Sequence, residues 1–179
     1  MNDANILVTS DTHGNSKVIK NLLENYKGVI IAAVHLGDYA RDAARFAHTG
    51  ANSGIYHIVN GNTDPLVGVY DERVIEIAGK RIFITHGHRY DVKISLDNLI
   101  YKAKELQVDA CLFGHTHIAA LFNQNGIVFL NPGSLTYPHT DMERSYGLLR
   151  ISETAENGEL LHTVTGKILT YREPVWQEV

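Results

Sequence analysis

The chain has 179 residues, of which 44% are hydrophobic and 20% charged, and its formal net charge is -4. These values are typical of one ordinary domain with a hydrophobic core, and they exclude a disordered or fibrous protein. The slightly acidic balance, without a long basic run, disfavours nonspecific nucleic-acid binding, so a nucleic-acid partner is not indicated.

A single cysteine, Cys111, leaves no partner for an internal disulfide and is typical of a reducing compartment. The first residues lack the basic start and apolar stretch of a signal peptide, and the longest apolar run, 29–34, is too short to cross a bilayer. We therefore expect one cytoplasmic domain over residues 1–179, with no membrane partner. The oligomeric state, including a homo-oligomer, stays open.

The first half of the chain alternates β-rich and helix-like stretches, which is the order of βαβ units. In chain order, the predicted elements are a strand over 6–9, a helix over 16–26, a strand over 29–36, a helix over 42–48 and a strand over 55–59. The first helix carries apolar residues at steps of three and four, so we expect it to pack on a sheet.

After Asp64-Pro65 the pattern changes to hairpins and one further helix. The predicted elements are strands over 73–78 and 81–85 around Gly79-Lys80, a helix over 95–106 that Ser95 can cap, a buried strand over 110–113, strands over 119–122 and 127–130 around Asn125-Gly126, and strands over 146–151 and 160–169. The sequence thus predicts an α/β sandwich, parallel at the front and antiparallel at the back, without fixing the strand order.

Potential metal ligands follow five of the predicted strands at their carboxyl ends. They are Asp11, His13, Asp38, Asn62, His86, His115 and His117. Because crevices at the carboxyl ends of strands are where α/β proteins form sites, we expect these side chains to converge. Imidazole, carboxylate and amide ligands suit Mn, Fe, Zn, Ni or Co, and seven are too many for one tetrahedral ion, so two ions that share a carboxylate are expected.

These residues lie in five short blocks that resemble the calcineurin-like metallophosphoesterases. The blocks are Asp11-Thr12-His13, Gly37-Asp38, Gly61-Asn62, residues 85–88 (Thr-His-Gly-His) and residues 114–117 (Gly-His-Thr-His). Each block is weak alone, whereas all five together in this order are specific. The size and the Asn-Pro-Gly-Ser segment at 131–134 are most similar to the small YfcE-type phosphodiesterases, over roughly residues 5–150.

The resemblance implies a metallophosphoesterase-type sandwich, in which mixed central sheets are flanked by helices, and a ligand set for two divalent ions. The first ion would be held by Asp11, His13, Asp38 and His117, and the second by Asp38, Asn62, His86 and His115. Manganese is the first expectation for both ions, with Ni, Fe, Zn or Co as alternatives. A metal-bridging hydroxide would then hydrolyse a small-molecule phosphodiester substrate without a covalent enzyme intermediate.

One block departs from the commonest form of the superfamily. Many members carry a histidine after the Gly-Asn pair, near the leaving group, whereas this chain has Thr63. Threonine is no general acid near neutral pH, so diesters or activated esters are favoured as substrates. Besides Asn62, the catalytic candidate is His88, which lies beside Arg89 and is expected at the pocket rim to hold phosphate or to protonate the leaving oxygen.

Two other functions remain open at this stage. The same site would suit a phosphomonoesterase or nucleotide phosphatase, and a catalytically weak scaffold similar to the retromer subunit of this fold needs no turnover. The remaining histidines are expected outside the site, with His35 packed or supporting a ligand; they are His35, His48, His57, His139 and His162. The expected pocket walls are 39–45, 64–70 and 89–92, Cys111 is expected as a buried strand residue, and Tyr171, Pro174 and Trp176 are expected to cover a sheet edge.

Overall fold

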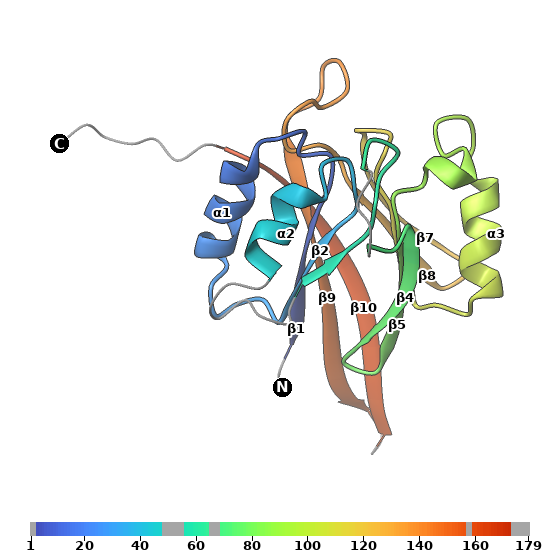
Figure 1. Ribbon diagram of the computed structural model, residues 1–179. Coiled ribbons are helices and arrows are strands. Elements are labelled where there is room, and N and C mark those ends of the chain that lie inside the picture. Colours follow the sequence, from blue (N-terminus) through green and yellow to red (C-terminus); the bar gives the residue numbers. More distant parts are fainter. Residues whose placement is uncertain (1–2, 48–55, 65–68, 157–158, 173–179) are drawn as a thin grey trace.

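The structure of the chain is a computed structural model, and it describes residues 3–47, 56–64, 69–156 and 159–172. Within these ranges, two five-stranded sheets pack face to face, and helices cover their outer faces (Figure 1). The first sheet has the order β10 (Glu159–Thr170), β9 (Ser145–Glu156), β1 (Ala4–Thr9), β2 (Ala32–His35) and β3 (Tyr56–Ile58). The second has the order β4 (Glu72–Ile77), β5 (Lys80–Thr85), β6 (Ala110–Leu112), β8 (Ile127–Pro132) and β7 (Ala119–Gln124). The predicted α/β sandwich with mixed sheets is therefore confirmed.

The βαβ units predicted for the first half of the chain are present. Strands β1, β2 and β3 pair in parallel, and α1 (Ser16–Asn25) and α2 (Arg41–Ala47) connect them across the outer face of the first sheet. On β1, Ile6 and Val8 are buried between the two sheets, whereas Leu7 is buried against α1. Both faces of the strand are covered, which explains why its sequence is apolar throughout.

The predicted strand over 29–36 begins three residues late. The Val29 amide donates to the Tyr26 carbonyl at 2.9 Å and closes the turn that follows α1. The side chains of Val29 and Ile31 are 52% and 49% exposed, so this part of the apolar run is not a buried strand. An apolar run without alternation does not mark the residue at which pairing begins.

Both predicted hairpins of the second sheet are present. Ala78 and Gly79 form the β4–β5 turn with φ of 48° and 72°, one residue earlier than predicted, and Asn125-Gly126 forms the β7–β8 turn with φ of 54° and 81°. Positive φ at both central positions belongs to the turn type whose twist matches paired strands.

The second sheet, which the later part of the chain forms, is not purely antiparallel, and here the prediction was wrong. Helix α3 (Asp97–Glu105) connects β5 to a parallel β6, which also pairs in parallel with β8. The α3 face with Leu99 and Ala103 is buried on the outer face of this sheet. Ser95, the predicted cap, accepts the Asp97 amide through its hydroxyl at 3.1 Å.

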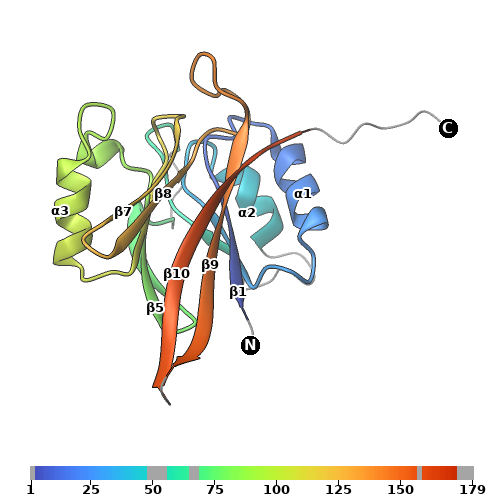
Figure 2. The same cartoon turned by 180° about the vertical axis from the view of Figure 1, so that it is seen from behind.

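The last two strands form a hairpin that is longer than predicted. Strands β9 and β10 pair antiparallel from Ser145–Thr170 to Glu156–Glu159, and they extend beyond β1 (Figure 2). Tyr171 is buried beside α1, where its hydroxyl accepts a hydrogen bond from the side-chain amide of Asn21 at 3.2 Å. Cys111 is fully buried on β6, as expected. His48, Pro174 and Trp176 lie outside the described residues, as does the side chain of His162.

No helix within the described part of the chain is long and apolar enough to span a membrane.

Candidate metal centre

The structure brings the seven predicted ligands together at the carboxyl ends of five strands. Asp11 and His13 follow β1, Asp38 follows β2, Asn62 follows β3, His86 follows β5, and His115 and His117 follow β6. Since β1, β2 and β3 run parallel in one sheet and β5 and β6 in the other, their carboxyl ends face the same end of the sandwich. Segments more than a hundred residues apart in sequence therefore share one site.

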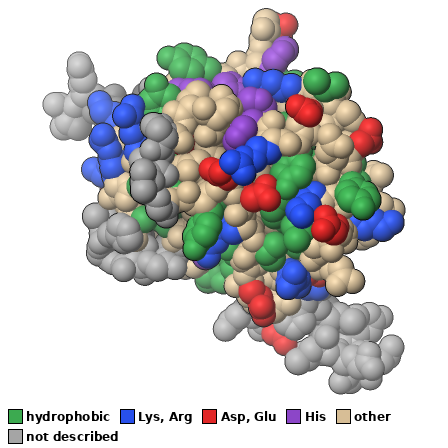
Figure 3. Space-filling model, turned by 45° about the vertical axis from the view of Figure 1, so that its right-hand side comes forward, with side chains coloured by type: hydrophobic (Ala, Val, Ile, Leu, Met, Phe, Trp, Pro, Cys, Tyr) green, Lys and Arg blue, Asp and Glu red, His purple; other side chains and the backbone are tan. Residues whose placement is uncertain are grey.

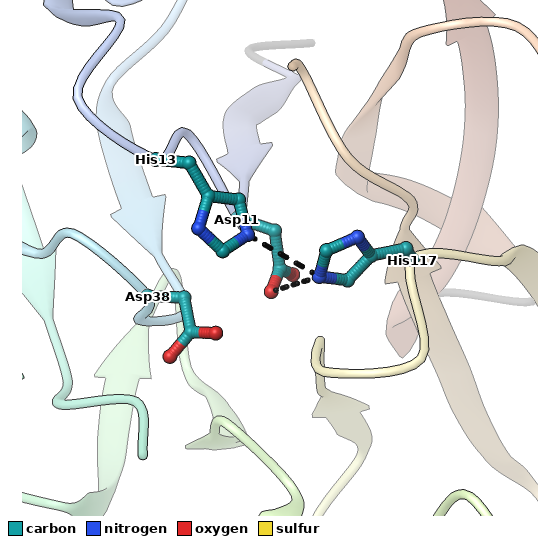
Figure 4. A group of neighbouring side chains, drawn as sticks. All are labelled: Asp11, His13, Asp38 and His117. Atoms are coloured by element: carbon teal, nitrogen blue, oxygen red, sulfur yellow. Dashed lines mark hydrogen bonds and ion pairs between the residues drawn. The ribbon is translucent and has the colours of Figure 1, made fainter. Parts of the chain in front are cut away.

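The first group of side chains consists of Asp11, His13, Asp38 and His117, whose donor atoms lie within 4.8 Å of one another (Figure 4). The Nε2 atoms of His13 and His117 are 3.4 Å apart, and His117 Nε2 is 3.1 Å from Asp11 Oδ1. Asp11 is fully buried and Asp38 nearly so, whereas both imidazoles are partly exposed. The group is open to a substrate on its imidazole side.

The second group consists of Asp38, His86 and His115, also within 4.8 Å, and Asn62 adjoins it. His86 Nε2 lies 3.1 Å from His115 Nδ1, 3.2 Å from Asn62 Oδ1 and 3.4 Å from Asp38 Oδ1. Asp38 is thus the one side chain that belongs to both groups among the described residues.

The hydrogen bonds behind two of the imidazoles fit a metal site. The Nδ1–H groups of His86 and His117 donate to the backbone carbonyls of Leu36 and Tyr137, the former at 2.7 Å. A carbonyl only accepts, so Nδ1 carries the proton and each Nε2 directs a lone pair into its group. These carbonyl partners have no sequence signature, and sequence reasoning could not find them.

The surroundings of Asp11 also suit a metal ion. Its Oδ1 atom is buried without a hydrogen-bond partner among the described residues, although the Nε2 lone pair of neutral His117 lies beside it. Two electron-pair donors at this distance need a cation between them, either a metal ion or a proton. The contact with Asp11 raises the pKa of His117, which favours a proton in that place when no metal ion is bound. Burial acts to raise the pKa of Asp11, but His117 and the charge of His86 outweigh it and hold that pKa below its usual range.

Backbone strain is concentrated at the same residues. Five of the predicted ligands have positive φ, between 46° and 67°, in a region that non-glycine residues rarely adopt; they are Asp11, His13, Asp38, His115 and His117. Strained positions persist where the surrounding structure enforces them, which is common at functional sites. These loops are therefore shaped for the placement of side chains and not for the lowest local energy.

Thr63, the residue after Asn62, holds Asp38 in place. Its amide and its hydroxyl both donate to Asp38 Oδ1, at 3.1 and 2.9 Å. The next residue, Asp64, accepts the amides of Ala40 and Gly61 at 2.9 Å each and so ties the loop after β3 to the loop after β2. Thr63 therefore orients the shared carboxylate.

A buried chain of hydrogen bonds supports the loop that carries Asp11 and His13. The Gly37 amide donates to His35 Nδ1 at 3.2 Å, so His35 Nε2 carries the proton and donates to the Thr12 hydroxyl at 3.1 Å. Thr12 in turn donates to Asp42 at 2.9 Å, and Asp42 also accepts the Gly14 amide. His35 thus lies outside the ligand groups, as expected, and connects two of the loops that carry them.

The burial of His35 within these hydrogen bonds predicts a pH dependence of stability for the metal-free protein. Burial lowers the pKa of His35 to about 4, against 6.5 for an accessible histidine. The unfolded chain therefore binds the proton more tightly, and stability falls as the pH drops from about 6.5 towards 4. We expect His35 to account for a loss of about 2 to 3 kcal/mol between pH 7 and pH 4.5. Urea unfolding at both pH values, on the wild type and on His35→Gln, measures this loss. Equal pH dependence of the two proteins would contradict it.

His88 lies beside the second group on a short 3-10 helix (His88–Tyr90) that the sequence did not predict. Its ring centroid is 5.4 Å from that of His86 and 6.1 Å from that of His115, and its Nδ1 is buried without a hydrogen-bond partner within the described chain. Burial, then the charges of His86 and Arg89, lower its pKa. Arg89 itself pairs with Asp71 at the rim.

A cleft of about 480 Å³ adjoins both groups. Its walls are Val92, Lys93, His115, Thr116, His117, Ile118 and His139. Figure 3 shows histidine side chains gathered on this face, with Lys and Arg side chains beside them. Val92 lies in the wall segment 89–92 that the sequence predicts, whereas His139, which was expected outside the site, belongs to neither donor group but lines the cleft beside them. It lies 22 residues beyond His117 in the chain, and only the tertiary contact from its amide to the His117 carbonyl, at 3.2 Å, reveals its position.

Comparisons with known proteins agree with this arrangement. The model of the calcineurin-like phosphoesterase superfamily domain matches residues 5–154. A probable metallophosphoesterase of Bacillus subtilis, YsnB, is 30% identical over 151 residues, which cover 84% of this chain and 86% of that protein.

Solved structures show the same fold. A predicted phosphoesterase from Streptococcus pneumoniae superposes with a TM-score of 0.72 at 28% identity, covering 96% of this chain and 99% of that one. Vps29 from Entamoeba histolytica, in a structure complexed with Zn²⁺, superposes with a TM-score of 0.64 at 25% identity, covering 93% and 98%. From the family match and these relatives together, we conclude that the chain belongs to the calcineurin-like phosphoesterase superfamily.

Proposed function

We propose that the chain is a metal-dependent phosphodiesterase with a two-metal site. The observation that carries this proposal is the position of Asp38, which belongs to both groups of donor atoms. A carboxylate between two groups is what a pair of ions a few ångströms apart requires as a bridge. Every donor is nitrogen or oxygen, which suits Mn, Ni, Fe, Zn or Co, and manganese is the ion that we expect first.

In this proposal the first ion is held by Asp11, His13, Asp38 and His117, and the second by Asp38, Asn62, His86 and His115. When bound, such ions neutralise phosphoryl oxygens and lower the pKa of a water molecule, which supplies both electrostatic stabilisation and a nucleophile. The chain's own part is positioning: buried carboxylates and backbone-anchored imidazoles fix the donor atoms before the substrate arrives.

The groups near the substrate favour diesters with good leaving groups. The Thr63 hydroxyl donates a hydrogen bond to Asp38 and is not free to protonate a leaving oxygen. The lowered pKa of His88 keeps its imidazole neutral at pH 7, so it acts as a hydrogen-bond donor to a phosphoryl oxygen more than as an acid. The amide group of Asn62 can donate to the substrate from its nitrogen while its oxygen faces His86.

The test is hydrolysis of bis-p-nitrophenyl phosphate and p-nitrophenyl phosphate by protein stripped of metal and then supplied with Mn²⁺. We expect turnover to return with metal and the diester to be preferred at least about tenfold in kcat/KM, since the monoester carries an additional negative charge that opposes attack by hydroxide at phosphorus. The opposite preference would favour the phosphomonoesterase or nucleotide phosphatase.

The second candidate function is a scaffold that binds metal without turnover. The similarity to Vps29 complexed with Zn²⁺ supports it, because that protein shares the fold and is described with an ion. Metal content measured by mass spectrometry separates the two candidates. Bound metal with no hydrolysis of either ester would favour the scaffold, whereas bound metal with diester turnover favours the enzyme.

A further inference from the structure

The cleft beside the metal centre is larger than a scissile phosphate needs. Its volume of about 480 Å³ lies within the range of pockets that enclose whole small molecules. His115 and His117 form its inner wall, so a substrate whose phosphate lies between the donor groups would extend one ester arm along the cleft. The chemistry of the outer walls then decides which arm fits.

Besides the two histidines of the donor groups, the cleft is lined by a cationic side chain, Lys93, and by a further imidazole, His139. Lys93 is exposed and makes no ion pair with any residue that the structure describes, and His139 is exposed in the same lining. None of the lining residues is acidic, so the Lys93 ammonium has no counter-ion there. A cleft that holds an unpaired ammonium and a further imidazole is a favourable environment for an anion, and lysine is a common phosphate ligand.

The backbone holds these two residues in place. The Ile94 and Ser95 amides both donate to the Asp91 carbonyl, at 2.7 and 3.2 Å, and form a tight turn around Lys93. His139 is fixed through its amide to the His117 carbonyl. Val92 and Ile118 give the same cleft an apolar wall, with Ile118 37% exposed. The cleft therefore combines two imidazoles of the donor groups with an apolar section, an unpaired ammonium and a further imidazole.

We propose that this cleft binds an ester arm that carries a second phosphate, with Lys93 and His139 as its ligands. The substrate class is then a phosphodiester in which an apolar or sugar spacer separates the scissile phosphate from a terminal phosphate. The inference rests on the proposed function, and it adds the recognition element that the metal centre itself does not provide.

The experiment compares two esters that differ only in the second phosphate: thymidine 5′-(p-nitrophenyl phosphate) and its 3′-phosphorylated form. For the wild type with Mn²⁺ we expect kcat/KM to favour the 3′-phosphorylated ester about tenfold at low salt, and the preference to shrink as ionic strength rises. In Lys93→Gln the ratio should fall to about twofold, because one charge-assisted contact is lost. The control Lys20→Gln, on an exposed position of α1, should keep the wild-type ratio.

A binding measurement keeps the inference separate from turnover. Calorimetry should show thymidine 3′,5′-bisphosphate binding more tightly than thymidine 5′-monophosphate to the wild type but not to Lys93→Gln. If neither ester is hydrolysed, the proposed function fails, and calorimetry alone decides on the phosphate subsite. Equal turnover and equal binding of the matched pairs, or an equal loss in Lys93→Gln and Lys20→Gln, would overturn the subsite while leaving the phosphodiesterase intact.

Discussion

Asp38→Asn is expected to lower metal-dependent diester hydrolysis on the order of a thousandfold, because a shared carboxylate contributes several kcal/mol through both ions. The exchange preserves volume at a residue that is only 4% exposed. Thr63 donates two hydrogen bonds to Oδ1, so the amide oxygen of the new side chain must occupy that position. The amide NH₂ then replaces Oδ2 and presents hydrogens where a lone pair was, while the oxygen left beside His86 no longer carries a negative charge.

Two measurements check this expectation. Mass spectrometry should find that Asp38→Asn loses metal from both positions, while circular dichroism shows an unchanged fold. The matched control is Asp97→Asn, which makes the same exchange at the exposed start of α3 and should retain metal and activity. Normal turnover by Asp38→Asn would refute the shared carboxylate, and loss of a single equivalent would assign it to one ion.

Much of the fold follows from local pattern, whereas the strand order does not. Strand β1 is apolar because both of its faces are covered, and Asn125-Gly126 fixes a hairpin through its backbone preferences. The pairing of β1 with β9, by contrast, joins strands at opposite ends of the chain. The parallel partners of β6 on both sides are likewise set by packing across the sheets. Nothing in the sequence of a three-residue strand encodes either neighbour.

The candidate site, like the fold, was predictable from the sequence only in part. The seven ligand candidates were predictable because side chains after parallel strands meet at one end of a sheet. What supports them was not, since His86 and His117 are anchored by the carbonyls of Leu36 and Tyr137, which every residue type possesses. His139 was missed for a related reason: it lies on a loop, and only its tertiary contact places it in the cleft.

The close approach of two ligand loops predicts the largest loss of stability. Gly37 precedes Asp38 with φ of +95°, and a Cβ added there would lie 2.4 Å from the Gly61 nitrogen and 2.8 Å from the Asn60 carbonyl carbon. These are backbone atoms, which cannot rotate away as a side chain does. We expect Gly37→Ala to lower the free energy of unfolding by about 3 kcal/mol, combining the left-handed conformation with overpacking.

Gly28→Ala separates these two causes. Gly28 also has positive φ, +77°, but an added Cβ would meet no atom within 4 Å. The control should therefore lose only the conformational contribution, about 1 kcal/mol. Urea unfolding of the metal-free variants gives both values, and equal losses would mean that the loops after β2 and β3 move apart at little cost. A larger loss at Gly37, accompanied by weaker metal binding, is expected because the same displacement carries Asp38 away from Asn62 and His86.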